Sequence, residues 1–238
     1  MTVRINLWSS PRNVSTAMMY AWRQRPDTTV IDEPLYAHAL DHTGRIHPGR
    51  DEILASQDTD GSRVISEVIL GPSPTPILFC KQMAKHLVGL DRGFLADCRN
   101  VLLTREPKDM LTSFQKQIPD TTLADTGLTE MVEILDAAVA AGQEPIVVDS
   151  RRLLADPPAV LAELCRRLEV PYDDAMLHWP PGPKPEDGVW APYWYEAVHR
   201  STGWAPWRAK DDRLLPHLEP VLAQSEELYE RLLPYAIG

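Results

Sequence analysis

The chain has 238 residues, 44% of them hydrophobic, and a formal net charge of −10. This length and apolar content are enough for one large domain or for a domain with a helical extension. We expect a single domain over residues 1–238, with a core over 1–172 and a mostly helical extension over 173–238. The acidic charge argues against nucleic acid as a partner, because nucleic-acid-binding proteins gather Lys and Arg against phosphates. No apolar run reaches the roughly 18–20 residues that span a bilayer, so we expect no membrane partner.

The N-terminus and the cysteines indicate the compartment. Residues 1–6 lead directly into an apolar run without the pattern of a signal peptide. The three cysteines, Cys80, Cys98 and Cys165, are isolated and lie in apolar stretches. Such cysteines suit buried thiols in a reducing compartment, and their spacing is not that of metal ligands. We therefore expect a cytoplasmic protein without a metal site.

Five short apolar runs alternate with helical patterns along the chain. The runs predict buried strands at residues 3–8, 28–32, 75–80, 100–104 and 145–149. The helical patterns cover 15–25, 107–117, 128–141 and 157–168, with further helix expected over 193–200 and 211–234. Residues 171–192 are rich in Pro, Gly and Trp and predict an irregular surface segment. This alternation is typical of a parallel sheet with helices on both faces, a three-layer α/β/α fold.

A polar loop with one arginine and two hydroxyls joins the first strand to the first helix. The first turn of a helix has free backbone N–H groups and a partial positive charge, so this position attracts an anion. The loop lacks the G-x-x-x-x-G-K-[ST] pattern of nucleotide hydrolases and resembles the 5′-phosphosulfate loop of sulfotransferases, P-[KR]-S-G-T-T. The matching positions are Pro11, Arg12, Ser15 and Thr16. Asn13 and Val14 stand where that family usually has Ser and Gly.

A second motif follows the fourth predicted strand. Residues 105–109 read Arg-Glu-Pro-Lys-Asp, and Ser113 lies eight residues after Arg105. The segment resembles the sulfotransferase element R-[DN]-P-[KR]-D-x-x-x-S and departs from it only at Glu106. The resemblance implies that Arg105 and Ser113 hold the 3′-phosphate of the donor.

A third stretch extends the resemblance as far as residue 172. The fifth strand ends in an acidic residue, and a D-P pair at 156–157 and L-x-V-P at 168–171 bracket the next helix. The nearest resemblance is to small bacterial sulfotransferases with D-E-P at 32–34 and K-x-M-A-x-H at 81–86. It implies a fold like that of P-loop nucleoside triphosphate hydrolases: a five-stranded parallel sheet of order 2-3-1-4-5, with the ligand above the C-terminal strand ends.

The resemblance also implies the chemistry. A sulfotransferase moves a sulfuryl group from 3′-phosphoadenosine 5′-phosphosulfate to a hydroxyl or amine of a small-molecule acceptor. Arg12 would neutralise charge on the bridging oxygen, and loop residues 12–16 would bind the 5′-phosphate. No metal is required, because cations and the helix dipole replace the magnesium of phosphoryl-transfer enzymes.

Two residues are candidates for the base that deprotonates the acceptor. Glu33 follows the second strand, where relatives with an acidic residue often place the base. His86 is the alternative, because cytosolic sulfotransferases use a histidine after the third strand, although its spacing here differs. Lys81, at the end of an apolar strand, is expected to be an active-site cation. Arg200 lies near the place of the late R-K-G loop of the family and is expected to bind the 3′-phosphate.

Two other functions remain open at this stage. A P-loop kinase or phosphotransferase could use a degenerate loop, but G-K-[ST] and a clear magnesium-binding motif are absent. A nucleotide-binding module without activity is the other alternative, since Val14 in place of Gly limits how closely a phosphate approaches the backbone. The sequence leaves open which tryptophan stacks on adenine and whether the protein forms a homodimer. Some proteins with such a domain also carry an aminotransferase domain, which we do not expect here.

Overall fold

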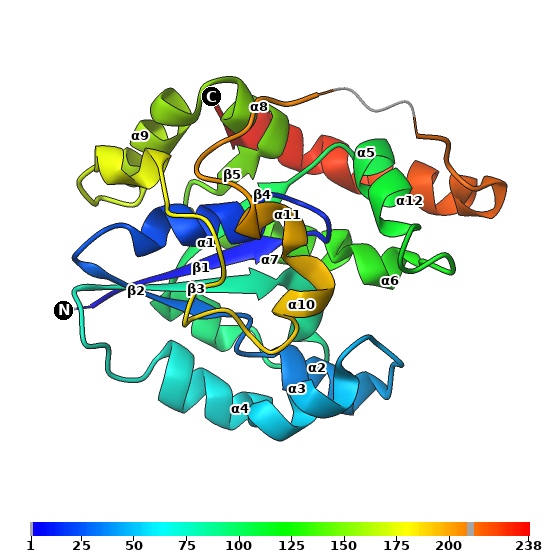
Figure 1. Ribbon diagram of the computed structural model, residues 1–238, viewed down its shortest axis with the longest axis horizontal. Helices are drawn as coiled ribbons and strands as arrows, with labels where there is room; N and C mark the ends of the chain where they lie inside the picture. Colours follow the sequence, from blue (N-terminus) through cyan, green and yellow to red (C-terminus); the bar gives the residue numbers. More distant parts are fainter. Residues whose placement is uncertain (1, 209–211) are drawn as a thin grey trace.

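The sheet is parallel, and its strand order is the one that the resemblance implied. The computed structural model describes residues 2–208 and 212–238, and there six strands pair in the order β2-β3-β1-β4-β5-β6 (Figure 1). Their bounds are β1 Val3–Ser9, β2 Thr28–Asp32, β3 Ile77–Met83, β4 Arg99–Thr104, β5 Ile146–Asp149 and β6 Ala236–Ile237. The α/β fold and the order 2-3-1-4-5 are confirmed, and β6 is an addition. A strand of two residues is too short to show periodicity.

The four helices expected before residue 170 are present. They are α1 Ser15–Arg23, α5 Pro107–Phe114, α7 Leu128–Ala140 and α9 Pro157–Arg167. Each begins where the sequence predicted and ends one to three residues earlier. Proline in the first turn and a capping carboxylate explain the sharp starts of two of them: Glu106 accepts hydrogen bonds from the N–H groups of Lys108 and Asp109, and Asp156 accepts one from that of Ala159.

The C-terminal region differs from the expectation in its details. In place of the helix expected over 193–200 there are two short helices, α10 Ala191–Trp194 and α11 Glu196–His199. The helix expected over 211–234 begins only at residue 219, after a 3₁₀ turn at Pro216–Leu218. Residue 211, the first of that expected helix, lies outside the described residues. The remaining helices are α2 Tyr36–Thr43, α3 Arg50–Ser56, α4 Gly61–Val64, α6 Leu123–Thr126, α8 Ser150–Ala155 and α12 Glu219–Leu232. No helix in the described part of the chain is long and apolar enough to cross a membrane.

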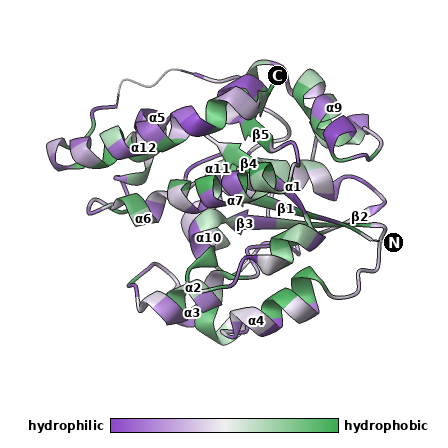
Figure 2. Cartoon of the chain, turned by 180° about the vertical axis from the view of Figure 1, so that it is seen from behind, coloured by the Kyte–Doolittle hydropathy of each residue, from purple (hydrophilic) through white to green (hydrophobic). Residues whose placement is uncertain are grey.

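Helices cover both faces of the sheet because each central strand is apolar on both sides. In β1, Ile5 and Leu7 pack into a core formed with α1 and α9, whereas Trp8 packs into a core formed with α5, α7 and α12. Figure 2 shows the central strands largely in the hydrophobic colour, with mixed colours on the surrounding helices. α12 and β6 bring the C-terminal region into these layers, so the segment after residue 172 is part of the sheet architecture.

All six strands run in the same direction, so the loops that follow them meet at one edge. These loops include the one before α1, the D-E-P segment after β2 and the start of α5 after β4. The irregular segment that carries α10 and α11 crosses the same edge (Figure 1) and is tied back by a bridge between His178 and Gly203. Residues distant in the sequence thereby meet around one site.

Candidate active site

The loop before α1 is held by its own asparagine. Asn13 donates from Nδ2 to the Leu103 carbonyl of β4 at 2.9 Å, and its Oδ1 accepts from the Val14 N–H at 2.9 Å. Arg12 has a positive φ of 54°. A non-glycine residue in this region is strained, and such strain collects at functional sites.

Val14 does not distort the loop. Its φ is −89°, a value that any residue adopts, and its side chain packs partly buried against the core. The residue with positive φ is Arg12, so the turn does not need glycine at position 14. No side chain caps α1, which leaves the N–H groups of its first turn available to an anion.

Arg12, Arg105 and Ser113 meet in one cleft, although they come from two distant motifs. Arg12 Nε donates to Ser113 Oγ at 3.2 Å, and Arg105 Nη1 donates to the Arg12 carbonyl at 2.6 Å. Burial and the neighbouring Arg105 charge lower the pKa of Arg12, and burial lowers that of Arg105. Among the residues that the structure describes, Asp109 is the one carboxylate that pairs with either guanidinium, at 3.8 Å from Arg105. Two positive charges with one distant partner favour a bound anion.

The cleft around these residues, called here the donor cleft, holds about 1600 Å³ of empty space. Trp204 and Trp207 line it, and the Arg151 guanidinium lies 4.4 Å from the Trp207 ring centroid. Trp8, Trp22 and Trp190 are at most 2% exposed and do not line this cleft, so they are unavailable for stacking on adenine there.

Arg200 does not reach the donor cleft, which corrects its expected position. Its side chain is exposed and pairs with Glu196 one helical turn earlier, at 2.6 Å. It lines a surface depression beside Pro157 and His178 that adjoins the donor cleft. In the segment after α11, Ser201 and Gly203 line both spaces, whereas Arg200 lines only the depression.

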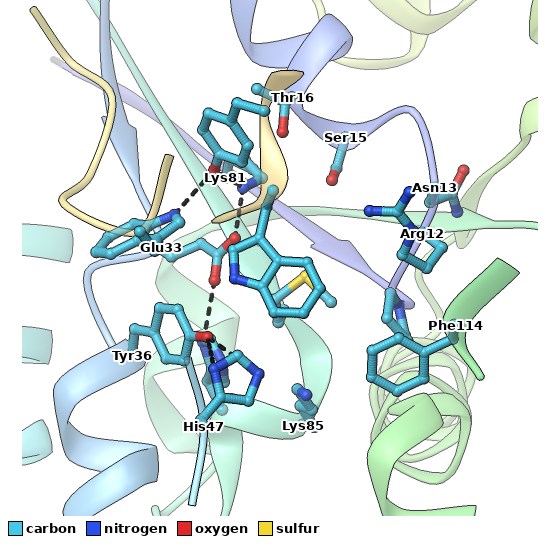
Figure 3. Close-up of a pocket in the computed structure, with 16 residues that line it drawn as sticks. Arg12, Asn13, Ser15, Thr16, Glu33, Tyr36, His47, Lys81, Lys85 and Phe114 are labelled. Atoms are coloured by element: carbon cyan, nitrogen blue, oxygen red, sulfur yellow. Dashed lines mark hydrogen bonds and ion pairs between the residues drawn. The ribbon is translucent and has the colours of Figure 1, made fainter. Parts of the chain in front are cut away.

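A second pocket, with about 580 Å³ of empty space, adjoins the donor cleft and contains both candidate bases (Figure 3). The two spaces share Arg12, Asn13, Thr16 and Trp194 in their walls. This pocket, called here the acceptor pocket, is lined on its other sides by the aromatic side chains of Tyr36, His47, His86, Phe114, Trp190 and Tyr195.

Glu33 is held by a buried lysine. Lys81 Nζ donates to Glu33 Oε1 at 2.5 Å and to Asp32 Oδ1 at 2.9 Å. Burial raises the pKa of Glu33 despite the opposing effect of Lys81, and Asp32 adds to the rise. Burial alone would lower the pKa of Lys81, but the two carboxylates outweigh it and raise that pKa. Glu33 also has a positive φ of 40°, a second strained residue at this site.

Two residues of the Lys81 network, Asp32 and Tyr195, were not predicted to have a role in the site. Tyr195 accepts from Lys81 Nζ at 2.5 Å and donates to Asp32 Oδ2 at 2.7 Å, while Trp190 Nε1 donates to Tyr195 at 3.0 Å. Asp32 belongs to the D-E-P motif, which was a signal for its position but not for its role. Tyr195 lies in a segment without a readable motif. Lys81 thus contacts three protein oxygens, so its ammonium is directed at the protein network rather than at the donor cleft.

His86 lies beside Glu33 without bonding to it. Its Nδ1 is 3.8 Å from Glu33 Oε2 and has no hydrogen-bond partner among the described residues. The ring stacks on Tyr36 with centroids 4.5 Å apart. Burial, together with Lys85 and other nearby positive groups, lowers the pKa of His86 well below 6.5, so the ring is neutral at pH 7. Both candidate bases therefore face one pocket, within contact distance of each other.

Fold and site together define an α/β protein of the P-loop type, with an anion-binding loop and a basic cleft beside a buried carboxylate. Comparison with known families is consistent with this. Residues 3–219 match the model of the sulfotransferase domain, and the chain belongs to that family. The sulfotransferase domain from the Synechococcus PCC 7002 olefin synthase has the same fold, with a TM-score of 0.57, 17% sequence identity and coverage of 97% of this chain and 96% of that one.

Two curated relatives from Arabidopsis thaliana are more similar in sequence. Branched-chain-amino-acid aminotransferase-like protein 2 is 42% identical over 202 residues, which are 84% of this chain and 36% of that protein. Branched-chain-amino-acid aminotransferase-like protein 1 is 40% identical over 231 residues, 97% of this chain and 40% of that protein. This chain therefore spans well under half the length of these two relatives.

Proposed function

We propose that this protein is a sulfotransferase that uses 3′-phosphoadenosine 5′-phosphosulfate as donor and sulfates a hydroxyl or amine of a small molecule. The observation that carries the proposal is the shared wall of the two spaces: the donor cleft and the acceptor pocket meet at Arg12, Asn13 and Thr16. A group bound at the loop is thereby open to both sides. Group transfer between two bound molecules needs this arrangement.

The residues of the donor cleft fit a nucleotide with two phosphate positions. The uncapped N-terminus of α1 suits a 5′-phosphate, and the pair Arg105 and Ser113 suits a 3′-phosphate. Trp204 and Trp207 offer aromatic faces for the adenine. Charge-assisted contacts supply the affinity here, because Arg12 and Arg105 are poorly neutralised by the protein.

The donor supplies the transferable sulfuryl group, and the chain supplies a cation and a base. The acceptor oxygen or nitrogen forms a bond to sulfur while the bond from sulfur to the bridging oxygen breaks. Arg12 neutralises the negative charge left on the 5′-phosphate. Glu33 Oε2 takes the acceptor proton, since Oε1 is engaged by Lys81 and the raised pKa makes the carboxylate a better base. His86, a neutral ring whose Nδ1 lies 3.8 Å from Glu33 Oε2, is the alternative base.

The first test is nucleotide binding. Thermal unfolding is measured with adenosine 3′,5′-bisphosphate, with adenosine 5′-phosphate, and with ATP plus magnesium. We expect the bisphosphate to raise the melting temperature most, because only it engages Arg105 and Ser113 together with the loop. A larger shift with ATP plus magnesium would contradict the proposal and favour a kinase.

The second test is transfer itself. A panel of hydroxyl- and amine-bearing small molecules is incubated with ³⁵S-labelled donor, and labelled products are separated by chromatography. We expect at least one labelled acceptor product. Tight bisphosphate binding with no transfer across a broad panel would instead identify a nucleotide-binding module without activity.

A further inference from the structure

We propose that the acceptor carries a carboxylate or comparable anionic group and that this group binds the Lys85 ammonium. The acceptor role rests on the proposed function, but the anion site does not depend on it. Lys85 follows β3 in the short 3₁₀ turn Ala84–Leu87 and lines the acceptor pocket (Figure 3). The sequence analysis gave it no role.

A second chamber adjoins the acceptor pocket, and Lys85 lines both. This inner chamber holds about 540 Å³ of empty space and shares Tyr36, His47, Lys85 and His86 with the acceptor pocket. Much of its remaining wall is apolar, with Ala39, Leu40, Val88 and Ala124. Lys85 therefore stands at the junction, where it can bind a group attached to a molecule that spans both spaces.

The Lys85 ammonium makes no hydrogen bond and no ion pair with any residue that the structure describes. It lies 5.5 Å from the centroid of the Phe114 ring. Burial lowers the pKa of its ammonium, whereas the charges of Asp125, Glu33 and Glu130 act to raise it. The side chain is only partly buried, so a ligand in the pocket can reach its ammonium and form a charge-assisted contact with it.

The carboxylates around Lys85 are committed elsewhere or lie too far away. Asp125 pairs with Arg45 at 2.5 Å and accepts from the N–H and hydroxyl of Thr122. Glu33 pairs with Lys81. Glu130 also lines the inner chamber, but it makes no ion pair with Lys85, one of its oxygens is buried without a partner, and burial raises its pKa toward the neutral form.

The positive charges of Arg12 and Lys85 disfavour a cationic group beside them. Burial lowers the pKa of His47 to about 4 and leaves that ring neutral, and Arg45 in the adjoining chamber is already paired with Asp125. Tyr36 and Phe114 provide aromatic walls on either side. The substrate class that fits is a hydroxy or amino acid derivative with an apolar body whose carboxylate lies at Lys85, directing its nucleophile toward Glu33.

The test measures binding of anions without requiring transfer. Isothermal titration uses the full chain saturated with adenosine 3′,5′-bisphosphate and a panel of straight-chain and phenyl-substituted carboxylic acids, each paired with its primary amide. We expect members of the panel to bind at least about 10-fold more tightly as acids than as amides, because a charge-assisted contact is lost in the amide. In Lys85→Met the preference should fall below about twofold, and Lys85→Arg should retain much of it.

Lys116→Met is the matched control, because it removes a lysine charge from the exposed surface, where Lys116 pairs with Asp212 at 2.7 Å. It should keep the preference of the unmodified protein. If Lys85→Met does not fold, Lys85→Gln replaces it, and the comparison of acids with amides in the unmodified protein stands without any variant. Equal binding of acids and amides, or binding of neither, would overturn the proposal. The bisphosphate titration alone reports on the donor site, so failure there would count against the proposed function and not against the anion site.

Discussion

The donor cleft and the acceptor pocket differ in how far their charged side chains are paired with other protein groups. In the donor cleft, Arg12 and Arg105 lie together with one carboxylate 3.8 Å away. At the base of the acceptor pocket, Lys81 is surrounded by two carboxylates and a tyrosine hydroxyl at 2.5–2.9 Å. Among the described residues, the first set of charges has only this one distant carboxylate as a partner, whereas the second set is paired internally.

Because of this difference, we expect changes in the donor cleft to alter ligand affinity and changes in the Lys81 network to alter the stability of the fold. Removing a cation from the donor cleft takes away a contact to a ligand and relieves repulsion within the protein. Removing a charge from the Lys81 network leaves an uncompensated charge in a buried place, which destabilises the fold. Variants of the two regions should therefore change different measured quantities.

The largest effect is expected for Lys81→Met. The change leaves Asp32 and Glu33 adjacent and buried without their shared cation. Breaking a buried ion pair in this way costs roughly 3–5 kcal/mol in the free energy of unfolding. Urea denaturation measures the loss. The double variant Asp32→Asn/Lys81→Met should recover part of it, and a Lys81→Met protein as stable as the unmodified one would show that the network contributes little.

Glu33→Gln should act on turnover rather than on donor affinity. The amide keeps the shape of the side chain and removes its basicity, so we expect kcat to fall by at least about 10²-fold. The dissociation constant of adenosine 3′,5′-bisphosphate should stay unchanged, because Glu33 does not line the donor cleft. His86→Asn should have a smaller effect. The reverse ranking would assign the base to His86.

The pH profile sharpens the same assignment. The base must be deprotonated, so kcat/KM should rise with pH through the pKa of Glu33. Burial raises that pKa above the ordinary value of 4.5, so the acidic limb should lie above pH 4.5. The limb should be absent in Glu33→Gln. An identical limb in that variant would point to a different titrating group.

Arg105→Ala should weaken donor binding without a large change in stability. Loss of a charge-assisted contact costs about 1.5–3 kcal/mol, or roughly ten- to over a hundred-fold in affinity. The loss should be far greater for adenosine 3′,5′-bisphosphate than for adenosine 5′-phosphate, as measured by isothermal titration. Equal losses for the two nucleotides would mean that Arg105 does not bind the 3′-phosphate.

The smallest effect is expected for Arg200→Ala. Arg200 is exposed and pairs only with Glu196 among the described residues, and exposed ion pairs contribute about 0–1 kcal/mol. Affinity for the bisphosphate should stay within about twofold of the unmodified protein. A tenfold loss would show that α11 turns when the nucleotide binds and would restore the expectation that Arg200 contacts the 3′-phosphate.

Local patterns in the sequence predicted the strands, and the resemblance of two contiguous motifs to sulfotransferase elements predicted which residues line the donor cleft. Each of the first five strands is an apolar run, and the loop at 11–16 and the segment at 105–113 are contiguous motifs. Once both motifs follow strands of one parallel sheet, they must lie at the same edge. The meeting of Arg12, Arg105 and Ser113 is therefore a consequence of strand direction, which short-range patterns encode.

The acceptor side depended on contacts that no local pattern records. Tyr195 reaches Asp32 from 163 residues away, because the segment with α10 and α11 folds back over the sheet edge. The same fold-back turns Arg200 outward. The sequence did not distinguish Lys85 from the other lysines; the tertiary structure places it beside a chamber, without an ion pair to any described residue. The sequence by itself determined the first five strands and the polar loop before α1, since these follow from residues close together in the chain, and the strand order followed from the resemblance to sulfotransferases. Only the tertiary structure decided which charges are paired and which remain open to a ligand, because pairing depends on distances between segments far apart in sequence.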